Sequence, residues 1–201
     1  MKLTTVLSLA PLLGAATAQD QQGQPFTLNI RWSNSPLTGP VNANGGSFYT
    51  GKPTTVVCPE NVPEADCPPV NTTSFVAQGS KLFLNAAVPG GQQVYISPSG
   101  RLTYTLPHSG YIPYGSLTDL PIFANSFLNP LLTLWLCADD SGANAWTVWA
   151  EYTNATTGAI MNNGSDGTNA CTRIMLEAEP YHGPMGYLFW THYDAILKRG
   201  D

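Results

Sequence analysis

Glycine and proline interrupt this chain at short intervals, and that spacing limits what the chain can fold into. The 201 residues include 19 glycines and 17 prolines, and between them lie short runs in which β-branched and aromatic residues alternate with polar ones. Such alternation has the period of a half-buried strand, and turn residues between the runs are typical of all-β folds. We therefore expect one all-β domain, either a β-sandwich or a β-barrel, a trefoil-like barrel included. The runs are residues 26–30, 47–50, 81–84, 93–96, 101–105, 132–136 and 146–150.

One of these regions predicts a β-hairpin. Residues 88–105 read VPGGQQVYISPSGRLTYT, with alternating runs on either side of the turn sequence SPSG at residues 97–100. Proline fits the second position of such a turn, and glycine takes a positive φ without steric cost. A hairpin then explains most of the conspicuous residues of this stretch without a ligand. One predicted face carries Val94, Ile96, Leu102 and Tyr104, and the other carries Tyr95 and Thr103.

The start of the chain predicts export. Residues 1–18 combine a lysine, an apolar run too short to span a bilayer, and small residues before Gln19, which is the pattern of a secretory signal peptide. We expect one all-β domain over residues 19–179 and a tail over residues 180–201. Within that tail, residues 187–198 lack proline and glycine, so a short helix and an irregular segment are both compatible with the sequence.

Four cysteines follow the predicted signal peptide, and an even number in an exported chain favours disulfides. They are Cys58, Cys67, Cys137 and Cys171. Sequence alone allows three pairings, of which we predict the sequential one, Cys58 with Cys67 and Cys137 with Cys171. A zinc site is the alternative, but no two cysteines have the C-x₂-C spacing that zinc sites favour.

Glycosylation signals agree with export. Asn-x-Ser/Thr sites occur at Asn71, Asn154 and Asn163. Such sites are modified on exposed loops of secreted proteins. We expect a glycan on at least one of them.

The charge balance argues against anionic partners. Eight lysines and arginines face thirteen aspartates and glutamates, and Lys2 would leave with the signal peptide. Nucleic acid and anionic membranes are bound through basic patches, and this sequence has no basic cluster, so we expect neither partner. A neutral polar surface rich in aromatic residues suits sugars, although many extracellular β proteins share it.

Catalytic constellations are weak in this sequence. A nucleophile needs an oriented base, and the histidines His108, His182 and His192 accompany no G-x-S-x-G elbow. Glycoside hydrolysis needs two carboxyl groups across a cleft, and the adjacent Asp139 and Asp140 are expected in a turn. We therefore predict no catalytic residue, no metal and no cofactor. Two alternatives stay open: a hydrolase of extracellular polymers that uses His108 with a carboxylate, and a secreted effector that binds a host protein.

Aromatic residues are the remaining candidates for binding. Flat rings can stack against sugar rings while amides bond the hydroxyls. Aromatic groups in loops rich in glycine and proline tend to be accessible. The candidate ligand-binding residues are Trp32, Tyr95, Tyr111 and Tyr114.

Three segments resemble a known family. Residues 41–58 read VNANGGSFYTGKPTTVVC, residues 88–116 read VPGGQQVYISPSGRLTYTLPHSGYIPYGS, and residues 146–150 read WTVWA between Cys137 and Cys171. These segments resemble the small secreted fungal proteins called IgE-binding proteins, which are related to the phialide cell-wall protein PhiA. The resemblance covers about residues 26–178. Ser97 and Tyr114 stand where the family usually has aspartate and proline, which puts a shared ligand contact through the hairpin turn in doubt.

The resemblance implies a non-enzymatic protein of a filamentous fungus that is exported or associated with the cell wall. It links the chain to wall or conidiation biology, with antibody binding in hosts as an incidental property. No catalytic residue can be carried over. Wall polysaccharide is the expected partner, and we expect a monomer.

Overall fold

The computed structural model describes residues 23–33, 37–60, 62–63, 67–123, 127–129, 131–139, 144–153, 160–161 and 171–189. The predicted signal peptide, the sites at Asn154 and Asn163, and the tail from residue 190 onward lie outside the described residues. So do the side chains of six strand residues, namely 32, 33, 152, 153, 160 and 161. Over the described ranges, no helix has the length and apolar character needed to cross a membrane.

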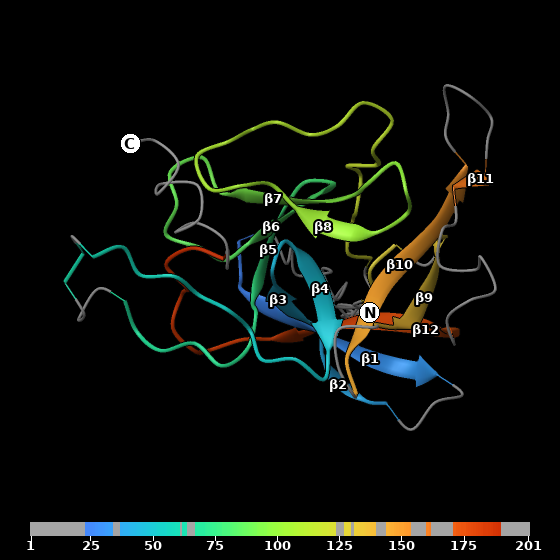
Figure 1. Ribbon diagram of the computed structural model, residues 1–201, viewed down its shortest axis with the longest axis horizontal. Coiled ribbons are helices and arrows are strands. Elements are labelled where there is room, and N and C mark those ends of the chain that lie inside the picture. The colour runs from blue at the N-terminus through green and yellow to red at the C-terminus, as the bar shows by residue number, and fades with distance from the viewer. Residues whose placement is uncertain are drawn as a thin grey trace, which may run out of the picture.

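The described residues form an antiparallel β-barrel (Figure 1). Nine strands, in the order β10-β9-β12-β1-β5-β6-β7-β8-β4, close on themselves because β4 also pairs with β10. Three short strands extend this wall: β2 pairs with β1, β3 with β4, and β11 with β10. The strands are β1 (Phe26–Ser33), β2 (Gly39–Pro40), β3 (Asn42–Asn44), β4 (Ser47–Thr50), β5 (Phe75–Gln78), β6 (Lys81–Leu84), β7 (Gln92–Ile96), β8 (Leu102–Tyr104), β9 (Thr133–Ala138), β10 (Trp146–Thr153), β11 (Ile160–Met161) and β12 (Cys171–Pro180).

The prediction of an all-β domain is confirmed, and of the two predicted architectures the barrel is the one formed. Each of the predicted runs overlaps a strand, whereas β5 and β12 were not predicted. The hairpin has the predicted register, with Val94 opposite Tyr104 and Ile96 opposite Leu102. Its turn is closed by the Gly100 amide, which donates to the Ser97 carbonyl at 2.8 Å, and Gly100 has a φ of 91°.

Alternate residues of the strands fill the barrel. On β1 the buried side chains are Phe26, Leu28 and Ile30, and the longest strand, β12, buries every second residue in the same way. Aromatic rings occupy one part of the interior, where the ring centre of Phe48 lies 5.6 Å from that of Phe75 and 5.2 Å from that of Tyr104. A continuous apolar interior of this kind is the main source of stability for a domain of this size.

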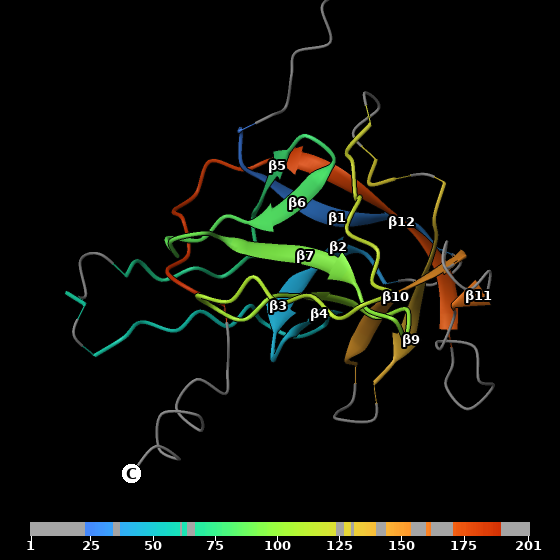
Figure 2. The same cartoon turned by 90° about the horizontal axis from the view of Figure 1, so that it is seen from above.

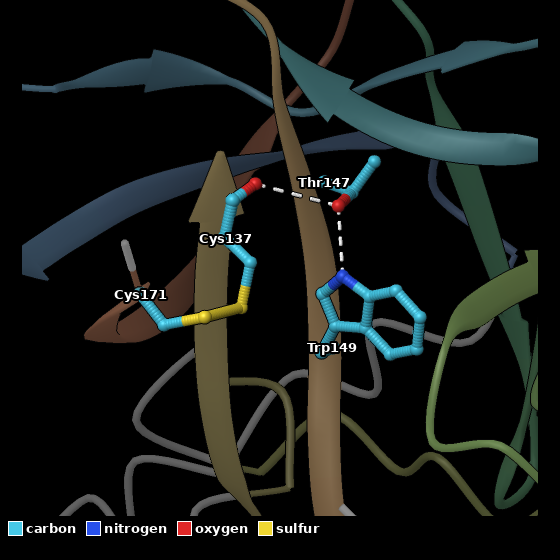
Figure 3. The surroundings of a disulfide bond; sticks show 4 residues. All are labelled: Cys137, Thr147, Trp149 and Cys171. Atoms are coloured by element: carbon cyan, nitrogen blue, oxygen red, sulfur yellow. Dashed lines mark hydrogen bonds between the residues drawn. A yellow bond between two sulfur atoms is a disulfide. The ribbon is translucent and has the colours of Figure 1, made fainter. Parts of the chain in front are cut away.

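Both predicted disulfides are present. Cys58 and Cys67 join two parts of the connection between β4 and β5, whose described residues extend to one side of the barrel in Figures 1 and 2. Cys137 on β9 and Cys171 on β12 are directly opposite each other in the sheet and form the second bond. Figure 3 shows this bond beside Thr147, whose hydroxyl donates to the Cys137 carbonyl at 3.4 Å.

The segment after β12, residues 181–189, is irregular and packs against the barrel. Phe189 is fully buried and belongs to the main apolar cluster. Leu188 pairs with Val57 in the β4–β5 connection, and the Gly186 carbonyl accepts from the Ala87 amide at 2.9 Å. This segment therefore connects the region beyond β4 with the region beyond β6.

Candidate functional site

The candidate site lies on the outer face of β6 and β7. Phe83 and Gln93 are opposite each other in this pair of strands, and their neighbours Leu84 and Gln92 point into the barrel. The segment that follows β8 runs past the same face. A hollow of about 410 Å³ lies between these elements and is lined by Phe83, Pro89, Gly90, Gly91, Gln93, Thr105, His108, Ser109 and Gly110.

A tight turn shapes the floor of this hollow. The Gly91 amide donates to the Val88 carbonyl at 2.8 Å, with Pro89 and Gly90 between them. Gly90 has a φ of 83°, which an L-residue rarely adopts, and proline before it fits a type II turn. Gly91 also has a positive φ, and a Cβ there would lie 3.1 Å from the Phe83 ring. Main chain thus forms the floor beside the ring.

A second hollow of about 460 Å³ adjoins the first. The two share Phe83, Gly90 and Gly91, so these three residues border both hollows. The second hollow extends over β5 and towards the segment after β12. Its other lining residues are Val76, Gln78, Leu84, Asn85, Ala86, Val88 and Met185.

Among the residues that the structure describes, no carboxylate, ammonium or guanidinium group lines either hollow. The polar lining consists of carboxamides, hydroxyls and the His108 imidazole. The side-chain nitrogen Nε2 of Gln93 is buried and has no hydrogen-bond partner among the described residues. His108 has a φ of 57°, a left-handed conformation in which histidine is more frequent than most residues. A neutral polar ligand would suit this lining, because nothing in it compensates a buried charge.

Two of the four predicted binding residues lie next to this site. Tyr95 is two residues beyond Gln93 on β7 and points to the same outer face, but it is buried. Burial raises the pKa of Tyr95, the hydroxyl of Thr103 opposes that rise, and the charge of Tyr111 adds to it. Tyr111 itself is 75% exposed.

The other two predicted residues have different surroundings. Tyr114, in the same segment after β8, is 83% exposed. Trp32 lies in β1 opposite Met175, and its side chain is outside the described residues. Phe83 and Gln93 are not predicted by the sequence patterns, although Gln93 belongs to the hairpin region of residues 88–105. The signal that could have found them is the period of two, which places both on the outer face once β6 and β7 pair.

A second polar cluster lies where β4, β8 and β10 meet. The Arg101 guanidinium lies 5.2 Å from the ring centre of Trp149, and its Nη2 is 3.9 Å from an Asp139 carboxylate oxygen. Burial raises the pKa of Tyr49, Arg101 lowers it, and Asp139 raises it further. The Trp149 indole donates to Thr147 at 2.7 Å. These contacts cross the strands that close the barrel, so the cluster stabilises the closure.

The remaining candidates for chemistry are dispersed. His182 is exposed in the segment after β12, and His192 and Asp140 lie outside the described residues. Glu177 and Glu179 both pair with Arg31 on the outer face of β1 and β12. Among the described residues, no three histidine, cysteine, aspartate or glutamate side chains gather as a metal site.

The described residues thus define the class of protein: a disulfide-bonded antiparallel β-barrel with two hollows on its outer face. Residues 27–190 match the family of PhiA-like secreted proteins, and the chain belongs to that family. The resemblance predicted from the sequence is thereby confirmed. The match extends past Pro180, through the part of the tail that packs against the barrel.

A curated relative agrees with this assignment. An uncharacterized secreted protein of Arthroderma benhamiae is 43% identical over 77 residues, which is 38% of this chain and 37% of the relative. The match therefore spans little more than a third of that relative's length. No solved structure matches this chain. Secretion is thus common to the family and to the relative.

Proposed function

We propose that this protein is a non-enzymatic component of the fungal cell wall that holds neutral wall polysaccharide on the outer face of β6 and β7. One observation carries the proposal: Ser109 and Gly110 line an uncharged hollow, and the next residue along the chain is the exposed Tyr111. Membership of a secreted family agrees with this location. A role in wall formation or conidiation is part of the proposal, as the family resemblance implies.

The exposure of two tyrosine rings supports binding rather than a passive structural role. Tyr111 is 75% and Tyr114 is 83% exposed, and both lie in one segment. An exposed ring gains from contact with the C–H face of a sugar, and its hydroxyl stays available for a hydrogen bond. Neutral polysaccharide needs no charged partner, which agrees with the lining of the hollow. These residues would extend the contact beyond the hollow itself.

The composition of the hollow favours binding over hydrolysis. His108 lines it, but no aspartate or glutamate is among the lining residues. Hydrolysis of glycosides needs a pair of carboxyl groups, and an imidazole that acts as a base needs a group to orient it. His108 has neither among the residues around this hollow. The hydrolase alternative is therefore the weaker reading of the site.

Sedimentation with insoluble wall polysaccharide tests the proposal. The secreted protein is mixed with purified chitin and β-glucan, and the bound fraction is compared with that of a Tyr111→Ala/Tyr114→Ala variant. We expect the variant to bind about thirtyfold more weakly, because each of the two lost ring contacts is worth on the order of 1 kcal/mol. Leu131→Ala is the matched control, since Leu131 is 86% exposed but offers no ring. Failure of the unaltered protein to sediment with any wall polysaccharide would refute the proposal.

A further inference from the structure

The two hollows repeat one combination of groups. Each brings a carboxamide next to apolar side chains, with Gln93 in the first and Asn85 and Gln78 in the second. We propose that the paired hollows bind the acetamido groups of a polymer of 2-acetamido sugars, the class to which chitin belongs. This specificity rests on the polysaccharide binding proposed above.

The first hollow fits an acetamido group better than a hydroxyl. The buried Gln93 nitrogen needs an acceptor, and an acetamido carbonyl can only accept. Rotation of the carboxamide about its terminal side-chain bond presents its nitrogen or its oxygen to the hollow, and an acetamido group has a partner for each. Phe83 and Pro89 provide the apolar surface for its methyl group. A sugar hydroxyl would bring no methyl group to that apolar surface.

The second hollow offers the same chemistry in a more apolar form. The Asn85 side chain donates to the Ser74 hydroxyl at 3.1 Å, which orients its carboxamide. Around it lie Val76, Val88 and Met185, and Met185 is 47% exposed at the rim. A sugar hydroxyl brings no methyl group to these apolar side chains. A methyl group attached to an amide satisfies both parts of this lining.

The border shared by the two hollows leaves room for one chain to fill both. Phe83, Gly90 and Gly91 form this border, and a Cβ added at Gly90 would meet no atom within 4 Å. A side chain at that position would therefore project into the path between the hollows. A β-1,4-linked polymer that carries an acetamido group on every sugar turns each unit over relative to the last, so it can place the groups of alternate sugars in neighbouring hollows. A glucan, which has only hydroxyls, cannot.

Competition between soluble oligosaccharides tests this specificity with the intact secreted protein. We expect a hexamer of N-acetylglucosamine to bind about tenfold more tightly than the β-1,4-linked glucose hexamer, which corresponds to about 1.4 kcal/mol. At a salt concentration that screens charge, chitin should retain the protein, and chitosan, its deacetylated and cationic form, should retain less. Equal affinity for the two hexamers, with sedimentation on β-glucan intact, would overturn the acetamido specificity and leave the proposed function standing. Sedimentation with no polysaccharide would overturn both.

Substitution at Gln93 assigns the effect to the first hollow. Gln93→Met keeps the length of the side chain and removes the amide, so it should bring the affinity for the acetylated hexamer down to that for the glucose hexamer. Gln24→Met is the matched control, because Gln24 is exposed and lines neither hollow. An unchanged preference in a folded Gln93→Met protein would overturn the assignment. Acetamido sugars also occur in N-linked glycans, so retention by an immobilised N-glycosylated protein, without retention by chitin, would overturn the proposed polymer.

Discussion

The Gln92 side chain and the Phe189 main chain form two hydrogen bonds across 97 positions of sequence. The Phe189 amide donates to the Gln92 side-chain oxygen at 2.8 Å, and the Gln92 side-chain nitrogen donates to the Phe189 carbonyl at 3.1 Å. The same nitrogen donates to the Thr105 carbonyl at 3.1 Å. Both Gln92 and Phe189 are fully buried. One carboxamide therefore joins the segment after β12 to the two strands of the hairpin.

Removing that carboxamide should destabilise the domain. Gln92→Leu leaves the buried Phe189 amide and carbonyl without partners, and each unsatisfied group costs about 1 to 3 kcal/mol. We expect the free energy of unfolding, measured by urea titration, to fall by about 3 kcal/mol. We also expect faster proteolysis after residue 180, because the segment after β12 loses these two bonds. Gln24→Leu, at an exposed position, should leave both unchanged. An unaltered unfolding midpoint in Gln92→Leu would show that the bonds are dispensable.

The two disulfides should contribute unequally. Cys58 and Cys67 are separated by 9 positions, and Cys137 and Cys171 by 34. Loop-closure entropy predicts about 2.6 and about 3.8 kcal/mol for loops of these lengths. Cys137 is also buried, so its loss removes packing as well. The double substitution Cys137→Ala/Cys171→Ala should therefore lower the thermal midpoint more than Cys58→Ala/Cys67→Ala, as calorimetry would measure. The reverse order would contradict this account.

Local signals explain which parts of the fold could be predicted from sequence. The hairpin around residues 97–100 was predictable because its turn residues lie next to each other in the chain and its strands alternate. The strand β12 also alternates, with Ile174, Leu176 and Ala178 buried. Its second half contains glutamate and alanine, which are poor strand formers, so the local signal for a strand is weak. Its position in the sheet comes from pairing with β1, more than 140 positions earlier, and no local window contains that partner.

The candidate site was less predictable because its parts come from separate segments. Phe83, Gln93 and His108 meet only when β6 pairs with β7 and the segment after β8 passes the same face. The exposure of aromatic side chains could not be predicted either. Tyr95 and Tyr111 both lie near glycine and proline in the sequence, yet the first is buried and the second is 75% exposed. Long-range pairing therefore decides which aromatic residues are available to a ligand.

The glycosylation signal at residues 71–73 should serve two separate purposes: Asn71 carries a glycan, and Thr73 also stabilises the fold. Asn71 is exposed, whereas Thr73 is fully buried, and its hydroxyl accepts from the Ala43 amide at 2.7 Å. Asn71→Gln should remove a glycan, seen as a mass shift, and leave the stability of the deglycosylated protein unchanged. Thr73→Ala should remove the glycan and cost about 2 kcal/mol, because a buried amide loses its partner. Thr73→Ser should keep both the glycan and the stability, because serine retains the hydroxyl. Equal stability of all three variants would refute the structural role.

Stability should fall in alkaline solution because buried tyrosines resist ionisation. Burial raises the pKa of Tyr104 above its ordinary value of 10.0, and the Gly46 amide, which donates to its hydroxyl, opposes that rise only in part. Above pH 10 the unfolded chain loses the phenol proton while the folded chain keeps it, so the unfolded state binds fewer protons. The free energy of unfolding then decreases with pH, by up to about 1.4 kcal/mol per pH unit for one such group.

Tyr104→Phe should remove that contribution and flatten the profile above pH 10, as urea titrations at pH 8 to 11.5 would show. Tyr114→Phe, which removes an exposed phenol, is the control. Parallel profiles for Tyr104→Phe and the unaltered protein would mean that Tyr104 ionises equally in both states, against its position between Phe48 and the Gly46 main chain.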